Sequence, residues 1–175
     1  MHPPTHGMIG WLMGSRLAHR RDRTLVTVAA LIPDIDGLTI LGGEALYGSW
    51  HHTFGHNLFA GVLLAAGAFA IARHRLKTAG LVLASFHSHL LGDLLGSGTG
   101  WGIPWLWPLS PHEWVFEPPF QWELVSWQNT LTTVLCMLGI GWMGLRHGRT
   151  IVEVVSLRAD AAVVEVLKRR FGRLA

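Results

Sequence analysis

The chain has 175 residues, of which 50% are hydrophobic and only 14% are charged, and its formal net charge at pH 7 is +3. Soluble globular domains usually contain about 25% charged residues, so this composition argues against an ordinary soluble domain and favours a membrane protein. A very apolar soluble helical bundle is the alternative. The cations stand at segment ends rather than over one basic surface, which argues against nucleic-acid binding. The only cysteine, Cys136, excludes an intrachain disulfide.

The first part of the chain predicts short or interrupted apolar segments. Residues 8–18 are apolar but too few to cross about 30 Å of hydrocarbon as a straight helix. Residues 24–42 are also apolar, but they contain the motif PDID, in which Pro33 bends or ends a helix. Such a break at membrane depth is tolerated only where it lines a polar cavity or is buried in protein. Residues 43–50 predict a loop.

Three apolar segments that predict membrane helices follow, at residues 57–72, 79–95 and 129–145. Asn57 or Thr53 is a suitable N-cap for the first of them. Residues 96–128 are rich in Gly, Pro and Trp and predict an irregular outer loop that covers a site. The tail at 150–175 alternates apolar and charged patches, which predicts a basic amphipathic helix on the inner membrane surface.

The cations predict an orientation. All 14 Lys and Arg residues fall into three clusters, at residues 16–23, at 73–77 and from 146 onward. Because cytoplasmic loops are enriched in Lys and Arg, the clusters predict an all-α integral membrane bundle with about four spanning segments in a bacterial inner membrane. Residues 1–7 and 43–56 then lie on the extracytoplasmic side. We expect a membrane-embedded domain at 1–148 and a basic tail at 149–175.

Candidate metal ligands lie toward the extracytoplasmic ends of these segments. His89 and Asp93 are four residues apart on a predicted helix and so share a face, where they can hold one divalent ion or one each of two ions. A His–Asp hydrogen bond inside a polar bundle is the alternative. Burying an ionisable pair in an apolar segment is costly unless it is compensated, which favours a bound cation.

The PDID motif places Asp34 and Asp36 close together in a broken segment. Two neighbouring carboxylates repel each other, and a cation relieves that repulsion. The alternative is a turn in which an aspartate caps the next segment. The position of the motif inside an apolar segment favours metal binding.

Several histidines complete the candidate set. His51, His52 and His56 precede the helix predicted at 57–72, and His51 and His56 can converge if His51 lies in the loop. His6, in the segment PPTHG, joins them on the extracytoplasmic side. A further pair, His112 and Glu113, fits a solvated loop better than a general acid or base.

Seven residues are therefore predicted metal ligands: His6, Asp34, Asp36, His51, His56, His89 and Asp93. The predicted catalytic residues among them are Asp34, Asp36, His89 and Asp93. Mixed nitrogen and oxygen ligands suit zinc, with manganese or iron as alternatives, and the size of the set predicts two or three ions. Such ions polarise an ester and generate hydroxide from water near neutral pH. No GxSxG, P-loop or HExxH motif is present.

The order of these motifs resembles that of YdjM-type inner-membrane proteins, which are described as LexA-regulated, membrane-bound, metal-dependent hydrolases. The resemblance covers the first two-thirds of the chain. Its matching segments are Thr5-His6, Pro33 to Asp36, His51 to Asn57, His89 to Asp93 and Trp107-Pro108. The family's third motif is similar to H-R-G-x-T-H-S, whereas this chain has HHTFGHN. His51 and His56 match that motif's histidines, and His52 stands where the pattern has Arg.

The H-x3-D spacing, the early histidine, the aspartate pair and the helical character also look like the zinc-dependent phospholipase C and P1 nuclease fold. That looser similarity implies hydrolysis of phosphoesters, with lipid phosphoesters of the outer leaflet as substrates. We therefore expect a hydrolase that acts on a phosphoester or a lipid-like substrate and contacts membrane lipids. A metal-binding transporter and a non-catalytic membrane module are the alternatives.

Overall fold

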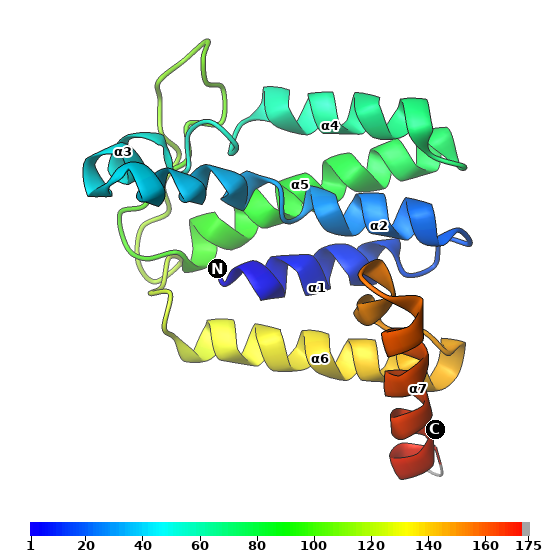
Figure 1. Cartoon of the computed structure of the whole chain (residues 1–175). Coiled ribbons are helices and arrows are strands. Elements are labelled where there is room, and N and C mark those ends of the chain that lie inside the picture. The colour runs from blue at the N-terminus through cyan, green and yellow to red at the C-terminus, as the bar shows by residue number, and fades with distance from the viewer. Residues whose placement is uncertain (173–175) are drawn as a thin grey trace.

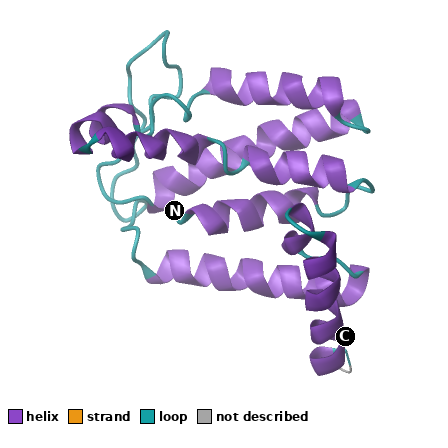
Figure 2. Ribbon diagram, viewed as in Figure 1, coloured by secondary structure: helices purple, strands orange, loops and turns teal. Residues whose placement is uncertain are grey.

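The computed structural model describes residues 1–172, and over that range the chain forms helices and loops without a β-strand (Figures 1 and 2). The all-α prediction is confirmed. The α-helices are α1 (Pro3–Gly14), α2 (Arg20–Ala29), α3 (Glu44–Trp50), α4 (Leu58–Ile71), α5 (Arg75–Gly96), α6 (Trp127–His147) and α7 (Leu157–Phe171). The 3₁₀ helices are η1 (Pro33–Gly42) and η2 (Ile151–Val154).

The longer helices form a bundle around α5. Helix α5 packs against α1, α2 and α4, while α6 joins the bundle through α1. These five helices run in roughly the same or opposite directions, whereas α7 crosses the end of α6 (Figure 1). The centre of the bundle contains two apolar groups on α5, one around Val82 and one around Phe86 and Leu90. Helix α5 thus supports the rest of the molecule.

The predicted segments agree with the helices α4, α5 and α6 to within a few residues. Asn57 is the N-cap of α4, because its side-chain oxygen accepts a hydrogen bond from the Ala60 N–H at 3.0 Å. The prediction of a loop at 43–50 was wrong, since α3 lies there. Gly43, with φ of 105°, redirects the chain, and the following Glu44 belongs to a run of good helix formers.

A helix that spans a membrane must be both long and apolar, and the helices of residues 1–172 can be compared with these two criteria. No single helix passes both criteria, but α2 and η1 pass them together as a pair bent by 52°. Helix α4 is apolar throughout, yet its 14 residues reach only about 21 Å. The expected four spanning segments therefore find support in this bent pair alone, and their number stays a prediction.

Helix α4 has most of its large side chains on the outside. Its only buried residues are Gly61 and Ala68, whereas Val62 and Leu63 are 50% and 74% exposed. A Cβ at Gly61 would lie 2.7 Å from the ring of Phe86, so glycine there allows α4 to lie close to α5. Small residues at the helix contact and large apolar residues outside are typical of helices in lipid.

The three cationic clusters meet at one end of the bundle. The Asp22 carboxylate accepts hydrogen bonds from the Arg73 and His74 N–H groups at 2.8 and 2.9 Å. Arg149 donates to the Ser15 carbonyl at 2.8 Å. These contacts join the first turn of α2 to the segment before α5, and the end of α1 to the segment before η2. All of them lie opposite the end that carries α3 (Figure 1).

A buried ion pair between Arg23 and Glu153 joins the C-terminal tail to the cationic end of the bundle. The Glu153 carboxylate, 2% exposed, accepts hydrogen bonds from Arg23 Nε at 2.6 Å and from Trp11 Nε1 at 3.0 Å. Arg23 also donates to the carbonyls of Leu17 and Ala18 at 2.7 and 2.9 Å. The tail therefore packs on α1 and α2, while the proposed division at residue 148 stays a prediction.

Substituting Glu153→Ala would leave the buried Arg23 guanidinium without its counter-charge. We expect the free energy of unfolding in detergent micelles to fall by about 3 kcal/mol. Glu165→Ala is the matched control, because Glu165 is exposed on α7, and its effect should stay within about 0.5 kcal/mol. Equal stabilities of the two variants would contradict a stabilising role for the pair.

Candidate metal centre

Four side chains from three parts of the chain converge at the end of the bundle opposite the cations. One ligand atom from each of Asp34, His56, His89 and Asp93 lies within 4.8 Å of the other three. Asp34 begins η1, His56 precedes α4, and the other two occupy adjacent turns of α5. All except Asp34 are buried, and this set is the candidate metal centre.

The spacing of the four atoms suits a shared cation. The Oδ2 atom of Asp93 lies 2.8 Å from His89 Nε2 and 3.4 Å from His56 Nε2. The two imidazole Nε2 atoms are 3.2 Å apart, and Asp34 Oδ1 lies 3.6 Å from His89 Nε2. Nitrogen and carboxylate oxygen ligands of one zinc ion, each about 2.0–2.2 Å from it, are separated by similar distances.

The second nitrogen of each imidazole is already engaged. His89 Nδ1–H donates to the Ala30 carbonyl at 2.8 Å, and His56 Nδ1–H donates to Asp36 Oδ2 at 2.8 Å. A backbone carbonyl only accepts, so in a neutral His89 ring the lone pair is on Nε2. Both rings are therefore held with Nε2 directed into the cluster, as in the carboxylate–histidine arrangement of metal sites.

The carboxylate oxygens of the set support the same interpretation. Asp34 Oδ2 is buried and accepts no hydrogen bond within the described residues, and Asp93 Oδ2 faces the two imidazole Nε2 atoms at 2.8 and 3.4 Å. Leaving a charged acceptor buried without a partner is costly, and a divalent ion would remove that cost. The donor set, its orientation and these carboxylate oxygens thus fit a metal ion.

The carboxylates beside His56 favour a positive charge on its ring. Burial alone would lower the pKa of His56, but hydrogen bonds to Asp36 and Asp93 raise it to about 9. The raised pKa shows that the two carboxylates favour positive charge at this position.

Asp36 and His51 lie beside the four-residue set. The Asp36 carboxylate contacts His51 Nδ1 and His56 Nδ1, each at 2.8 Å, and accepts from the Gly55 N–H at 3.1 Å. In a 3₁₀ helix, residues two apart point in directions about 120° apart. Asp34 therefore reaches the cluster while the Asp36 carboxylate contacts His51 and His56. That both aspartates are metal ligands stays a prediction.

His6, also a predicted ligand, lies against the opposite oxygen of Asp93. Its Nε2 is 3.1 Å from Asp93 Oδ1, and its ring stacks on His89 with centroids 3.8 Å apart. A Cβ at Gly92 would lie 2.9 Å from His6 Cε1, so glycine makes room for this ring on α5. The Met1 amino group also contacts Asp93 Oδ1. Asp93 thus presents Oδ2 to the cluster and Oδ1 to the N-terminal segment.

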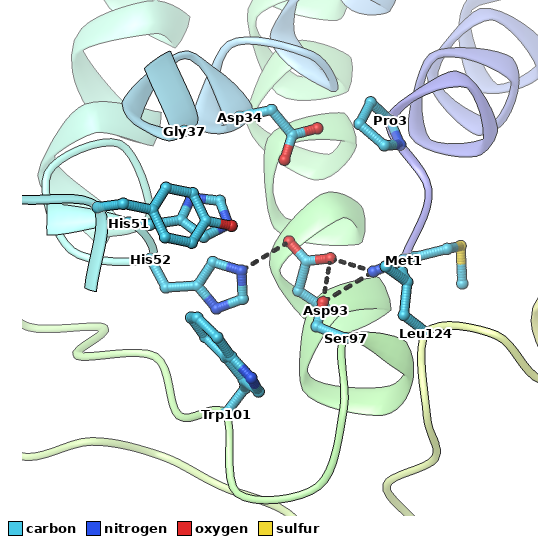
Figure 3. Close-up of a pocket in the computed structure, with 11 residues that line it drawn as sticks. Met1, Pro3, Asp34, Gly37, His51, His52, Asp93, Ser97, Trp101 and Leu124 are labelled. Carbon is cyan, nitrogen blue, oxygen red and sulfur yellow. Dashed lines mark hydrogen bonds and ion pairs between the residues drawn. The ribbon is translucent and has the colours of Figure 1, made fainter. Parts of the chain in front are cut away.

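A cavity of about 380 Å³ opens beside the cluster (Figure 3). Asp34 and Asp93 form its inner wall, and Tyr47, His52 and Trp101 are among its other lining residues. None of these three was predicted as a site residue. The only sequence signal for His52 is its spacing of four from His56. Trp101 lies in the segment 96–128 that was predicted to cover a site, whereas Tyr47 gave no sequence signal.

The irregular segment between α5 and α6 contributes a wall of this cavity. Leu124 and Trp101 come from it, and Asn129 fixes it in place by donating to the carbonyls of Gly96 and Leu124, both at 2.8 Å. Glu113 lines a second, adjacent cavity of about 270 Å³. The segment predicted to cover the site thus lies at its edge.

Comparison with protein families gives one match. The family described as "YdjM inner membrane protein" matches residues 1–170. No curated protein and no solved structure matches the chain. The looser similarity to the zinc phospholipase C and P1 nuclease fold therefore stays a prediction.

Substituting His89→Ala would remove one nitrogen ligand and the ring that separates His6 from His56. We expect bound zinc, measured by mass spectrometry on the purified protein, to fall to background. His87→Ala is the matched control: His87 is on the same helix, but its Nδ1–H donates to the Leu83 carbonyl at 2.8 Å and it is outside the four-residue set. Equal zinc contents of the two variants would contradict the candidate centre.

Asp36→Asn tests whether Asp36 orients the histidines or binds the ion itself. If Asp36 only orients the histidines, its substitution should lower the zinc affinity about 10–100-fold, and the protein should still bind the ion. Competition with a chromogenic chelator measures the affinity. A loss as complete as that of Asp93→Asn would show that Asp36 is a direct ligand.

Proposed function

Because this chain belongs to the YdjM inner membrane protein family and has a buried His/Asp cluster suited to a metal ion, we propose that it is a metal-dependent hydrolase of phosphoesters or lipid-like esters. The observation that carries this proposal is the pair of imidazole Nε2 atoms facing each other at 3.2 Å beside the carboxylate oxygens of Asp34 and Asp93. The predicted resident metal is zinc, with two or three ions expected and manganese or iron as alternatives.

In the proposed mechanism Asp34, His56, His89 and Asp93 hold the metal, which supplies a nucleophilic hydroxide near neutral pH when bound. Asp36 and the Ala30 carbonyl keep the two imidazoles oriented. The adjacent cavity, bounded by Asp34 and Asp93, holds the ester next to the ligands. Trp101, from the irregular segment, limits the access of water on the outer side of this cavity.

We further propose that the centre faces the extracytoplasmic side of the inner membrane. The three cationic clusters meet at the other end of the bundle, and cytoplasmic ends of membrane proteins are enriched in such residues. The exposed apolar side chains of α4 suit contact with lipid tails. Membrane lipids are therefore the expected surroundings, and the substrate is a small molecule or a lipid that reaches the site from the outer leaflet.

The activity can be tested on the zinc-loaded, detergent-solubilised chain with bis(p-nitrophenyl) phosphate and with phospholipid micelles. We expect hydrolysis that a chelator abolishes and zinc restores, and a loss of at least about 10³-fold for His89→Ala, since that variant lacks the centre. In spheroplasts, a membrane-impermeant chelator should abolish the activity as well.

His87→Ala is the control for activity, as it is for zinc content. Absence of hydrolysis across both substrate classes, with zinc bound, would contradict the hydrolase proposal. Zinc uptake into liposomes under those conditions would favour the transporter alternative. Activity that resists the impermeant chelator in spheroplasts but not in lysates would place the centre on the cytoplasmic side.

A further inference from the structure

His52 has an unusual position in the loop between α3 and α4. Its backbone has φ of 65°, the only positive φ of a non-glycine residue in the described chain. The residue is 5% exposed, and its ring lies between His56, with centroids 4.6 Å apart, and Trp101, with centroids 5.1 Å apart. A residue held in a sparsely populated conformation inside a site is often positioned for function.

The ring nitrogens of His52 have no hydrogen-bond partner in the described residues. Nδ1 is buried and unpaired. Nε2 lies 4.0 Å from Asp93 Oδ2, which is too far for a hydrogen bond. The Nε2–H of His52 is therefore available to an acceptor atom of a bound molecule without the loss of an existing hydrogen bond. Figure 3 shows the ring directed at Asp93 across the cavity.

His52 also lies where two cavities meet. It lines the cavity of about 380 Å³ beside the cluster and the adjacent cavity of about 270 Å³. No Lys or Arg of the described chain lines either cavity. Apart from a metal ion and the Met1 amino group, which already contacts Asp93, an anionic substrate would therefore depend on neutral N–H and O–H donors there.

We propose that His52 is a substrate-binding residue whose Nε2–H donates to an anionic oxygen of a phosphoryl group bound beside Asp93. This inference rests on the proposed function, because it assigns a phosphoryl group to the cavity of the hydrolase. His52 acts on the substrate and is not a ligand of the metal. The four-residue set remains complete without it.

The test is the binding of inorganic phosphate to the zinc-loaded full chain, measured by titration calorimetry, with zinc content determined in parallel. His52→Asn is the test variant, because asparagine tolerates positive φ but its side chain is too short to reach the phosphoryl oxygen. We expect a phosphate affinity about 10–100-fold weaker than that of the wild type and an unchanged zinc content. Thr53→Ala is the control, since Thr53 lines only the second cavity, and its affinity should equal the wild-type value.

Each outcome decides the proposal. Equal phosphate affinity of His52→Asn and wild type overturns it, and loss of zinc from His52→Asn overturns it by making His52 a metal ligand. Absence of phosphate binding to the zinc-loaded wild type overturns it too. Weaker phosphate binding by His52→Asn supports it even if no ester is hydrolysed. Phosphate affinity therefore tests the role of His52, and the hydrolysis assay tests the hydrolase proposal.

Discussion

The fold depends on the cost of placing Asp93 in the interior of the bundle. This carboxylate is 2% exposed, and nitrogen atoms that can carry or share a proton surround it. His89 and His56 contact one oxygen, and His6 and the Met1 amino group contact the other. An isolated buried carboxylate would be strongly destabilising. The N-terminal segment, helix α5 and the loop before α4 are therefore held together at one point.

Further hydrogen bonds orient the histidines that contact Asp93. His56 and His89 face the cluster because Asp36 and the Ala30 carbonyl take their Nδ1 protons. Asp36 is fixed in turn by the Gly55 N–H and by η1, the tight helix that follows the break at Pro33. The interruption in the apolar segment is thus the element that brings carboxylates to the centre, as irregular backbone does when it lines a polar site.

The two ends of the bundle use buried charge differently. Glu153 and Arg23 neutralise each other at the cationic end, and Arg23 also donates to the backbone carbonyls of Leu17 and Ala18. At the other end, Asp34 Oδ2 accepts no hydrogen bond within residues 1–172, and Asp93 Oδ2 lies 2.8 and 3.4 Å from two imidazole nitrogens. A satisfied network stabilises a fold, whereas nitrogen and oxygen atoms that converge on one point could hold a cation. This difference distinguishes the end of the bundle that could hold a metal ion.

The amino-acid sequence alone determined the helical class, the positions of α4, α5 and α6, and the separation of the cations from the candidate ligands. These follow from composition and from local spacing, as when His89 and Asp93 share a face four residues apart. Only the tertiary structure decided that Asp34 points to the cluster while Asp36 orients His51 and His56, and that His52 lines the cavity. Those roles depend on the direction of each side chain after η1 and the loop before α4 have packed against α5. Local spacing does not specify how segments far apart in the sequence are oriented toward one another.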